Sequence, residues 1–251
     1  MKKRDSILKK TRSSAFWVKV FPRFLFGTLV VSIIFVIYKI ITAESATPDV
    51  PYDHVRSDYV LMLLQCSFGL AVMFLPSMLE RRFGVSVPNN MYLVFLYAAI
   101  YLGEVRSFYY IVPRWDTILH AFSGAMLGTL GFSLVYLMND SKRVHVEISP
   151  AFVAIFAFFF AVSMGAVWEI YEFTMDGILG LNMQKFATEE GVMLIGRAAL
   201  RDTMKDIVVD IIGAGIACLA GYLSLKRKNG WLDRYALRRV GNKTDEVSSD
   251  E

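Results

Sequence analysis

Residues 151–173 read AFVAIFAFFFAVSMGAVWEIYEF, and this stretch decides the class of fold. It is apolar almost throughout, and its only acidic residues, Glu169 and Glu172, come near its end. A helix needs about 20 apolar residues to cross the hydrocarbon core of a bilayer. The stretch is therefore long enough to span a membrane as one helix, with two carboxylates close to one end.

Working outward, five more apolar runs of similar length occupy most of the chain. They cover residues 24–42, 59–79, 90–112, 117–138 and 204–225. The 251 residues are 55% hydrophobic and 20% charged, with a mean hydropathy of +0.44, whereas soluble domains carry about 25% charged residues. The sequence predicts an all-α fold, a polytopic membrane bundle of about six transmembrane helices. Gly124 and Gly128 form a GxxxG pattern, which is typical of close helix packing.

Basic residues set the orientation of such a bundle, because cytoplasmic loops are enriched in lysine and arginine. Eight lie in residues 1–23, two in each of the turns 80–89 and 139–150, and seven in the tail, 226–251. All four segments fall on one side of a six-span chain. We therefore expect both termini to be cytoplasmic, with a basic N-terminal segment, a six-helix transmembrane domain over 24–225, and a cytoplasmic tail.

Both ends of the chain carry further expectations. Residues 230–240 alternate aromatic or leucine side chains with charged ones and predict a short interfacial helix, and the polar residues 242–251 predict disorder. The run 24–42 follows a basic lead, as a cleaved signal peptide does, but the lead is long and the run contains Lys39. An uncleaved anchor is favoured, and cleavage stays an alternative.

Ionisable residues gather at one end of three of the runs, in stripes with helical spacing. The stripes are Asp116 and His120; Glu169, Glu172 and Asp176; and Asp202, Asp206 and Asp210. Residues three, four, seven or eight apart share one face of a helix. The predicted topology places all three stripes at the extracytoplasmic level, so we expect seven carboxylates and one imidazole to meet at a single depth.

So many carboxylates at one depth need a bound cation, shared protons or basic partners. Oxygen-rich ligation with one histidine suits Mg²⁺, Mn²⁺ or Ca²⁺ and admits Zn²⁺. The residues predicted to bind a divalent metal are Asp116, His120, Glu169, Glu172, Asp202, Asp206 and Asp210. Arg114, Arg197 and Arg201 lie at the same end and are predicted to hold a phosphate or carboxylate of a substrate.

Simpler roles remain open for several of these residues. Asp116 and Asp202 would serve equally as N-terminal helix caps, Asp176 as a solvated loop residue, and His120 as a hydrogen-bonded packing residue. The same acids could also form a structural network. These simpler roles explain least well the acids that lie within or next to apolar runs. Those acids are Glu169, Glu172, Asp206 and Asp210.

The three stripes resemble a family pattern. Residues 115–120 (WDTILH) before Ser123-Gly124, residues 169–172 (EIYE), and residues 202–206 (DTMKD) before Gly213-Ala214 look like the D-x3-H-x3-G, E-x2-E and D-T-x2-D…G-A elements of the YjdF-like bacterial inner-membrane proteins. The resemblance covers about residues 90 to 225. It implies a multi-pass protein of the bacterial inner membrane. The YjdF-like family has no established reaction, and the same holds for the VanZ-like proteins considered below.

More distantly, the pattern is similar to VanZ-like envelope proteins, which are associated with glycopeptide resistance. Glu172 and Asp210 depart from the residues usual there and make this site more acidic. The resemblance supports a polar site that these residues share, without naming its chemistry.

Three classes of function follow. The first is a membrane enzyme that uses a divalent metal on envelope lipids or cell-wall precursors, such as a phosphorylated lipid; no HExxH or GxSxG motif names its chemistry. The second is a proton- or cation-coupled transporter, although no inverted repeat is visible. The third is a non-catalytic binding protein with a structural polar network. The basic residues follow the positive-inside pattern, so no nucleic-acid partner is expected, and the oligomeric state is left open.

Overall fold

The computed structural model describes residues 19–42, 56–86, 90–139, 148–188, 192–227 and 238–239. Its elements are α2 (Phe21–Thr42), α3 (Arg56–Phe83), β1 (Val85–Ser86), α4 (Asn90–Leu96), the π-helix η2 (Tyr97–Val105), α5 (Phe108–Ile111), α6 (Trp115–Asn139), α7 (Pro150–Leu179), α8 (Arg201–Arg227) and β2 (Arg238–Arg239). Within these ranges, α2, α3, α6, α7 and α8 are long and apolar enough to cross a membrane, and Met91–Val105 is a shorter apolar helix. The predicted all-α membrane bundle is confirmed.

The third apolar run differs from its prediction as one helix over residues 90–112. It continues from α4 into η2, which ends at Val105 and is followed by the capping residue Arg106. The next residue, Ser107, is left-handed with a φ of 58°. The short helix α5 then folds back, so that Tyr109 covers Gly103, where an added Cβ would lie 2.5 Å from its ring. The packing of the Tyr109 ring on Gly103 favours the end of the helix before Ser107. Hydropathy alone does not predict this end.

The predicted tail is described only at β2, which pairs antiparallel with β1 through Val85–Arg239 and Ser86–Arg238. These two residues form a strand where the sequence predicts an interfacial helix. The rest of that helix, the predicted disorder of 242–251 and most of the basic segment 1–23 lie outside the described residues.

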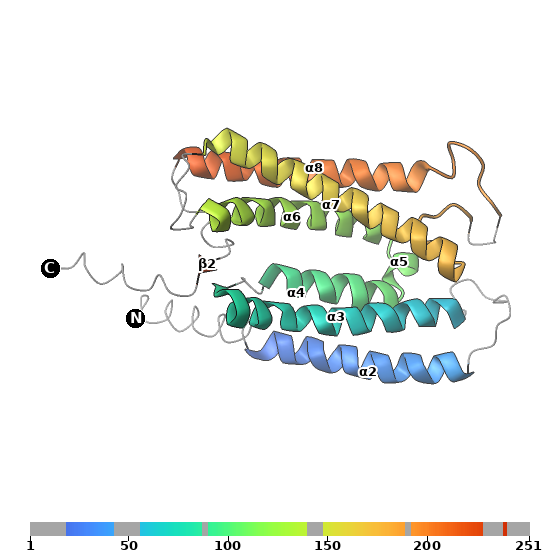
Figure 1. Ribbon diagram of the computed structural model, residues 1–251. Helices are drawn as coiled ribbons and strands as arrows, with labels where there is room; N and C mark the ends of the chain where they lie inside the picture. The colour runs from blue at the N-terminus through green and yellow to red at the C-terminus, as the bar shows by residue number, and fades with distance from the viewer. Residues whose placement is uncertain are drawn as a thin grey trace, which may run out of the picture.

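The helices form two groups (Figure 1), and each group has a buried core of its own. In the group of α2, α3, α4 and η2, the buried core contains Leu25, Leu29, Cys66, Leu93, Leu96 and Ile100. In the group of α6, α7 and α8, it contains Phe132, Val135, Val153, Ala157 and Cys218. The second group carries all three acidic stripes.

Glycines allow α6 and α8 to pack closely. An added Cβ on Gly124 would lie 2.6 Å from the backbone oxygen of Asp210, and one on Gly213 would collide with the carbonyl of Ala121. The predicted packing role of the GxxxG pattern is therefore confirmed. This close approach fixes the height of α8 relative to α6, and so the register of their acidic residues.

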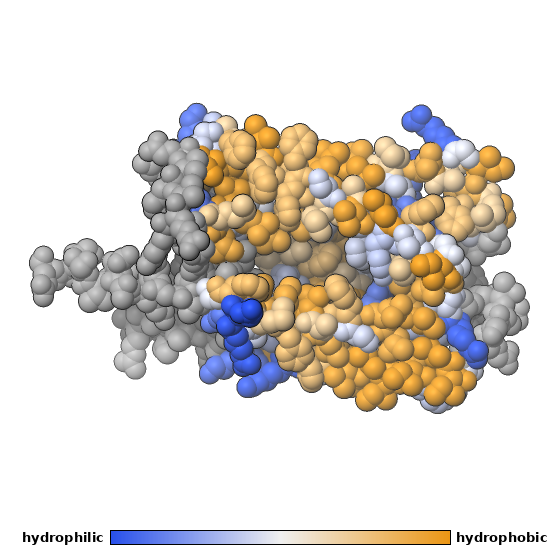
Figure 2. Space-filling model, viewed as in Figure 1, coloured by the Kyte–Doolittle hydropathy of each residue, from blue (hydrophilic) through white to orange (hydrophobic). Residues whose placement is uncertain are grey.

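The outer surface of the bundle is apolar, as Figure 2 shows along the helices. Large hydrophobic side chains such as Phe68, Phe173 and Ile216 are each about two-thirds exposed. Exposed apolar surface of this extent suits contact with lipid rather than water. The chain is a multi-pass membrane protein.

Successive long helices run in alternating directions, so the start of α2 and the end of α8 lie at the same end of the bundle (Figure 1). The opposite end, which we call the site end, holds α5, the beginnings of α6 and α8, and the end of α7. The arrangement brings the three acidic stripes to one end of the bundle. Which side of the membrane that end faces stays a prediction.

Candidate functional site

His120 is the residue through which the three helices meet at the site end. Its Nδ1 atom lies 3.2 Å from Oδ2 of Asp210 on α8, and its Nε2 atom lies 4.0 Å from Oε1 of Glu169 on α7. Asp116, one turn earlier on α6, places Oδ1 3.6 Å from the same Nε2 atom. The predicted stripes thus converge on one imidazole, which is 6% exposed.

The two ring nitrogens of His120 have different surroundings. Nδ1 is within hydrogen-bond distance of Asp210, whose other carboxylate oxygen accepts a hydrogen bond of 3.3 Å from the hydroxyl of Ser123. In a neutral histidine that donates from one nitrogen to a carboxylate, the second nitrogen is unprotonated, which is the usual arrangement of a metal-bound imidazole. Nε2 faces carboxylate oxygens of Asp116 and Glu169, so Asp210 orients the ring toward them.

A glycine on α7 makes room for Asp210. An added Cβ on Gly165 would lie 2.5 Å from Oδ2 of Asp210, the atom that contacts His120. A side chain at residue 165 would therefore push the Asp210 carboxylate out of its place. Gly165 lies one turn before Glu169 on the same face of α7. This face therefore provides the Glu169 carboxylate and leaves room for the Asp210 carboxylate.

Asp116, His120, Glu169 and Asp206 form what we call the carboxylate–histidine cluster. One ligand atom each of Asp116, His120 and Asp206 lies within 4.8 Å of the others. Glu169 is 5% exposed, and neither of its carboxylate oxygens has a hydrogen-bond partner among the described residues. A buried polar atom without a partner costs about 1–3 kcal/mol, and more when it is charged. Glu169 is therefore the acid of the cluster whose charge is least well compensated by described residues.

Gln184 and Thr203 lie beside the Glu169 carboxylate and interact with it, but their well-aligned hydrogen bonds go to other atoms. The side-chain amide of Gln184 donates to the backbone oxygen of Glu169 at 3.3 Å and to the hydroxyl of Thr203 at 2.9 Å. The carboxylate of Asp206 is similar, since Lys205 Nζ lies 3.1 Å from its Oδ1 atom but outside hydrogen-bond geometry. Both oxygens of Glu169 and Oδ1 of Asp206 thus lack a well-aligned hydrogen bond from a described donor, although Lys205 forms an ion pair with Asp206.

Two lysines connect the acidic residues at the rim of the cluster. Lys185 Nζ lies 2.9 Å from Asp116 Oδ2 and 3.0 Å from Asp202 Oδ2. Lys205 Nζ lies 3.2 Å from Asp202 Oδ1 and 3.1 Å from Asp206 Oδ1. Burial alone would lower the pKa of Lys185, but the carboxylates of Asp116 and Asp202 outweigh it and raise the pKa above the usual lysine value. Asp202 is therefore shared between two ammonium groups.

Hydrogen bonds to Asp176 hold the loop that follows α7 at the site end. The buried carboxylate of Asp176 accepts hydrogen bonds from the backbone N–H groups of Met183, at 2.7 Å, and Gln184, at 3.0 Å. Lys185 follows in the left-handed region, with a φ of 49°. Asp176, for which the sequence left a solvated role open, is buried and holds this loop instead.

Three residues predicted to bind metal have other close partners in the structure. Asp202 pairs with two lysines, Asp210 bonds to His120 and Ser123, and Glu172 accepts a 2.9 Å hydrogen bond from the indole of Trp168. Their role as ligands stays a prediction. Sequence reasoning missed Lys185 and Gln184 because they lie in a loop without periodicity, and only the positive charge of Lys185 distinguished it.

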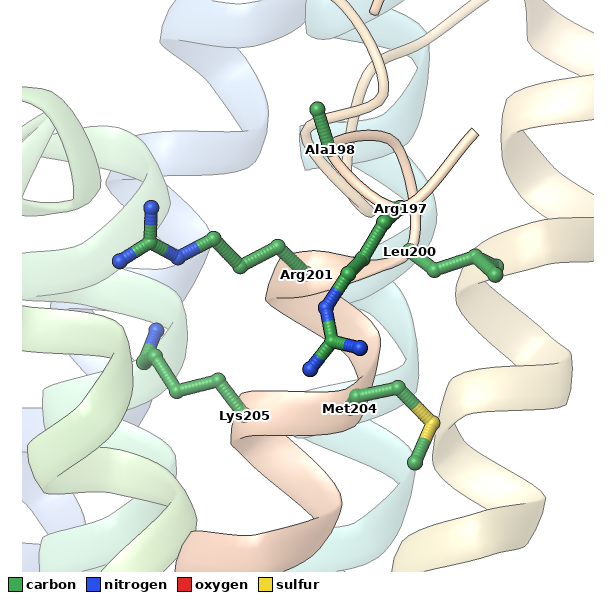
Figure 3. Close-up of a pocket in the computed structure, with 6 residues that line it drawn as sticks. All are labelled: Arg197, Ala198, Leu200, Arg201, Met204 and Lys205. Atoms are coloured by element: carbon green, nitrogen blue, oxygen red, sulfur yellow. The ribbon is translucent and has the colours of Figure 1, made fainter. Parts of the chain in front are cut away.

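The predicted arginines line two neighbouring cavities. Arg114 and Arg201 line a cavity of about 610 Å³ together with Asp116, Lys185 and Lys205. Arg197 lines a second cavity, of about 810 Å³, to which Arg201 and Lys205 also belong. In Figure 3, Arg201 and Lys205 point to one side of α8 and Leu200 and Met204 to the other. The structure thus brings the three arginines to the site end, beside the cluster rather than within it.

Comparison with known proteins agrees with this architecture. Residues 21–227 match a family described as "Predicted membrane protein (DUF2238)". An uncharacterized protein of Thermotoga maritima is 31% identical over 145 residues, which cover 56% of this chain and 66% of that relative. No solved structure matches the chain. The similarity to VanZ-like proteins stays a prediction. The match to most of the described chain shows that the protein belongs to the predicted membrane protein family DUF2238.

Proposed function

We propose that the carboxylate–histidine cluster binds a divalent metal ion, and that the protein uses this ion on an envelope lipid or cell-wall precursor. We place the site at the extracytoplasmic face of a bacterial inner membrane, following the charge pattern of the loops. The observation that carries the metal site is Glu169, a buried carboxylate that receives no well-aligned hydrogen bond from the described residues and lies 4.0 Å from His120 Nε2.

The spacing of the cluster supports a metal ion. Ligands about 2.1 Å from an octahedral ion lie about 3 Å apart when adjacent and about 4.2 Å apart when opposite. His120 Nε2 lies 3.6 Å from Asp116 and 4.0 Å from Glu169, inside this range. A small inward movement of these side chains is enough to coordinate an ion.

The donor set narrows the choice of metal. Three carboxylates and one imidazole suit Mg²⁺, Mn²⁺, Ca²⁺ or Zn²⁺, and the imidazole favours the transition metals among them. A bound ion would offset the negative charge of Glu169 and Asp206 and act there as a Lewis acid or activate water. Asp210 would set the tautomer of His120, as outer carboxylates do in other metal sites.

A structural polar network is the second candidate, and the two lysines favour it. Lys185 and Lys205 join Asp116, Asp202 and Asp206 through ion pairs without any metal. This network leaves Glu169 unexplained, since no described cation other than His120 lies within ion-pair distance of it. We therefore rank metal binding first. A cation-coupled carrier would need a charged path to the opposite end of the bundle, where none of the described buried residues is charged.

The substrate class rests on location and charge. Arg114, Arg197 and Arg201 lie at the same end as the cluster, and guanidinium groups bind phosphate and carboxylate oxygens in pairs. An amphiphile with an anionic head group would reach this end from the outer leaflet. The reaction itself is not specified by any nucleophile motif.

Metal analysis tests the proposal. Purified full-length protein is exchanged into buffers with Mg²⁺, Mn²⁺ or Zn²⁺, washed, and analysed by elemental mass spectrometry beside Glu169→Gln and Asp206→Asn. The matched control is Glu104→Gln, which alters a carboxylate that accepts a hydrogen bond from Gln65 on the neighbouring helix. We expect about one ion per chain in wild type and control, and its loss in both cluster variants.

Thermal unfolding provides the second measurement. A metal at about 100 times its dissociation constant should stabilise the folded protein by about 2.7 kcal/mol. Absence of metal from the wild type in all three buffers would exclude the metal site. If Asp206→Asn then lowered the melting temperature, the structural network would be the better explanation.

A further inference from the structure

The cavity beside the cluster has an excess of positive charge. Arg114, Lys185, Arg201 and Lys205 line it, against a single lining carboxylate, Asp116. The two lysines are matched by aspartates of the rim, but neither arginine forms a salt bridge with a described residue. Two guanidinium groups from different elements therefore line one cavity without a described counter-ion.

The backbone supports a binding role for this cavity. Among the described residues, Ser107, Arg114 and Lys185 are the only ones other than glycine with a positive φ. A side chain in the left-handed region costs about 1–3 kcal/mol, and such strain clusters at ligand-binding sites. Two of these three residues line the cavity, and both carry a positive charge.

The neighbouring cavity adds an apolar side. It shares Arg201 and Lys205 with the first cavity, and its other lining residues include Leu200 and Met204. Both are more than half exposed, and Figure 3 shows them on the side of α8 away from Arg201 and Lys205. Cationic and apolar side chains thus line this cavity from opposite sides of the first turns of α8, at the site end of the bundle.

We infer that the two cavities together bind an amphiphile with a phosphate head group, with Arg114 and Arg201 holding the phosphate. A guanidinium pairs two N–H groups with two phosphate oxygens, so two arginines satisfy a dianionic phosphomonoester. The apolar chain lies along Leu200 and Met204. The inference deepens the proposed function by naming the substrate class, and the phosphate site itself does not depend on the metal.

Asp116 links this cavity to the cluster. Its Oδ2 atom pairs with Lys185, and its Oδ1 atom faces His120 Nε2. A phosphate bound in the cavity attracts the Lys185 ammonium group and draws it away from Asp116. The Asp116 carboxylate is then available to coordinate the metal. This part rests on the proposed function. Metal and phosphate should therefore each increase the affinity of the other, because such a coupling is reciprocal.

Calorimetric titration of the full-length protein in a non-ionic detergent tests the inference. The probes are dihexanoyl phosphatidic acid, dihexanoyl phosphatidylcholine and inorganic phosphate, which separate the head group from the chains. We expect phosphatidic acid to bind at least about tenfold more tightly than either of the others. The double variant Arg114→Gln with Arg201→Gln should lose at least about tenfold in affinity. Arg106→Gln, an exposed arginine at the same end that lines neither cavity, should stay within about twofold of wild type.

Three outcomes would overturn the inference: wild-type affinity in the double variant, an equal loss in Arg106→Gln, or equal binding of inorganic phosphate. Repeating the titration with Mn²⁺ separates it from the proposed function. If phosphatidic acid binds but the metal does not, the metal site fails and the phosphate site stands. If the metal binds but phosphatidic acid does not, the phosphate site alone fails. Coupling predicts tighter phosphatidic acid binding with Mn²⁺ in wild type, and no such gain in Glu169→Gln.

Discussion

The Nδ1 atom of His120 lies 3.2 Å from the Oδ2 atom of Asp210, 90 residues further along the chain. This contact crosses from α6 to α8 and fixes the plane of the imidazole. As a result, Nε2 points toward two carboxylates of the cluster, those of Asp116 and Glu169. The pair therefore decides which histidine nitrogen is available to a cation.

Substitution Asp210→Asn should weaken metal binding without removing a proposed ligand. An asparagine amide can donate to Nδ1, which would move the proton to Nε2 and remove its lone pair. We expect the affinity for Mn²⁺ to fall about 10–100-fold, as is typical of changes in residues that orient a metal-bound histidine. Electron paramagnetic resonance of free Mn²⁺ measures this affinity. Unchanged affinity would show that Asp210 does not set the tautomer; Ser123→Ala, which removes a weaker contact, is the graded comparison.

Substitution Lys185→Met should raise the affinity for metal. The ammonium group lies 2.9 Å from Asp116 and opposes a second positive charge there. A unit charge about 4 Å away contributes about 1–4 kcal/mol at the dielectric constants of water and protein surfaces, so we expect at least about a fivefold increase in Mn²⁺ affinity. The control is Lys226→Met, at the other end of α8. A decrease would instead show that Lys185 positions Asp116 for the metal.

Helix α7 contains two glycines whose substitution separates an effect on site geometry from an effect on stability. In Gly165→Ala the new methyl group would displace the Asp210 carboxylate, whereas nothing lies within 4 Å of an added Cβ on Gly177. Gly177→Ala should keep metal affinity and stabilise α7 by about 0.5–1 kcal/mol. Gly165→Ala should lose metal affinity to a degree similar to Asp210→Asn. Thermal unfolding and Mn²⁺ titration of both variants check this, and equal metal affinities would contradict it.

The raised pKa of Lys185 predicts a dependence of stability on alkaline pH. Because its folded-state pKa lies above the ordinary value of 10.5, its ion pairs contribute fully below pH 10.5. That contribution is lost as the pH rises further, since the unfolded chain releases its proton first. We expect the difference in unfolding free energy between wild type and Lys185→Met to be constant from pH 8 to 10 and to shrink above 10.5. Denaturant titrations across this range measure it, and a difference that shrank below pH 9 would contradict the assignment.

Much of the site followed from local pattern. Each acidic stripe repeats at helical spacing, and each lies at one end of an apolar run, so alternating spans had to bring the stripes to one end of the bundle. The class of fold followed from the lengths of the runs. The third run was the exception, because the left-handed Ser107 and the ring of Tyr109 on Gly103 end a helix that hydropathy alone would continue.

The sequence by itself thus determined a helical membrane bundle with its charges gathered at one end, since helix period and bilayer thickness act on each segment separately. Only the tertiary structure decided which acids face one another. The rotation and height of α6, α7 and α8 depend on contacts at Gly124, Gly165 and Gly213. These contacts place Glu169 toward His120 and leave Asp202 to the lysines, one of which comes from a loop that no period predicts. Which residues pair between helices depends on the packing of segments that are distant in the sequence. Local spacing along one helix does not predict that packing.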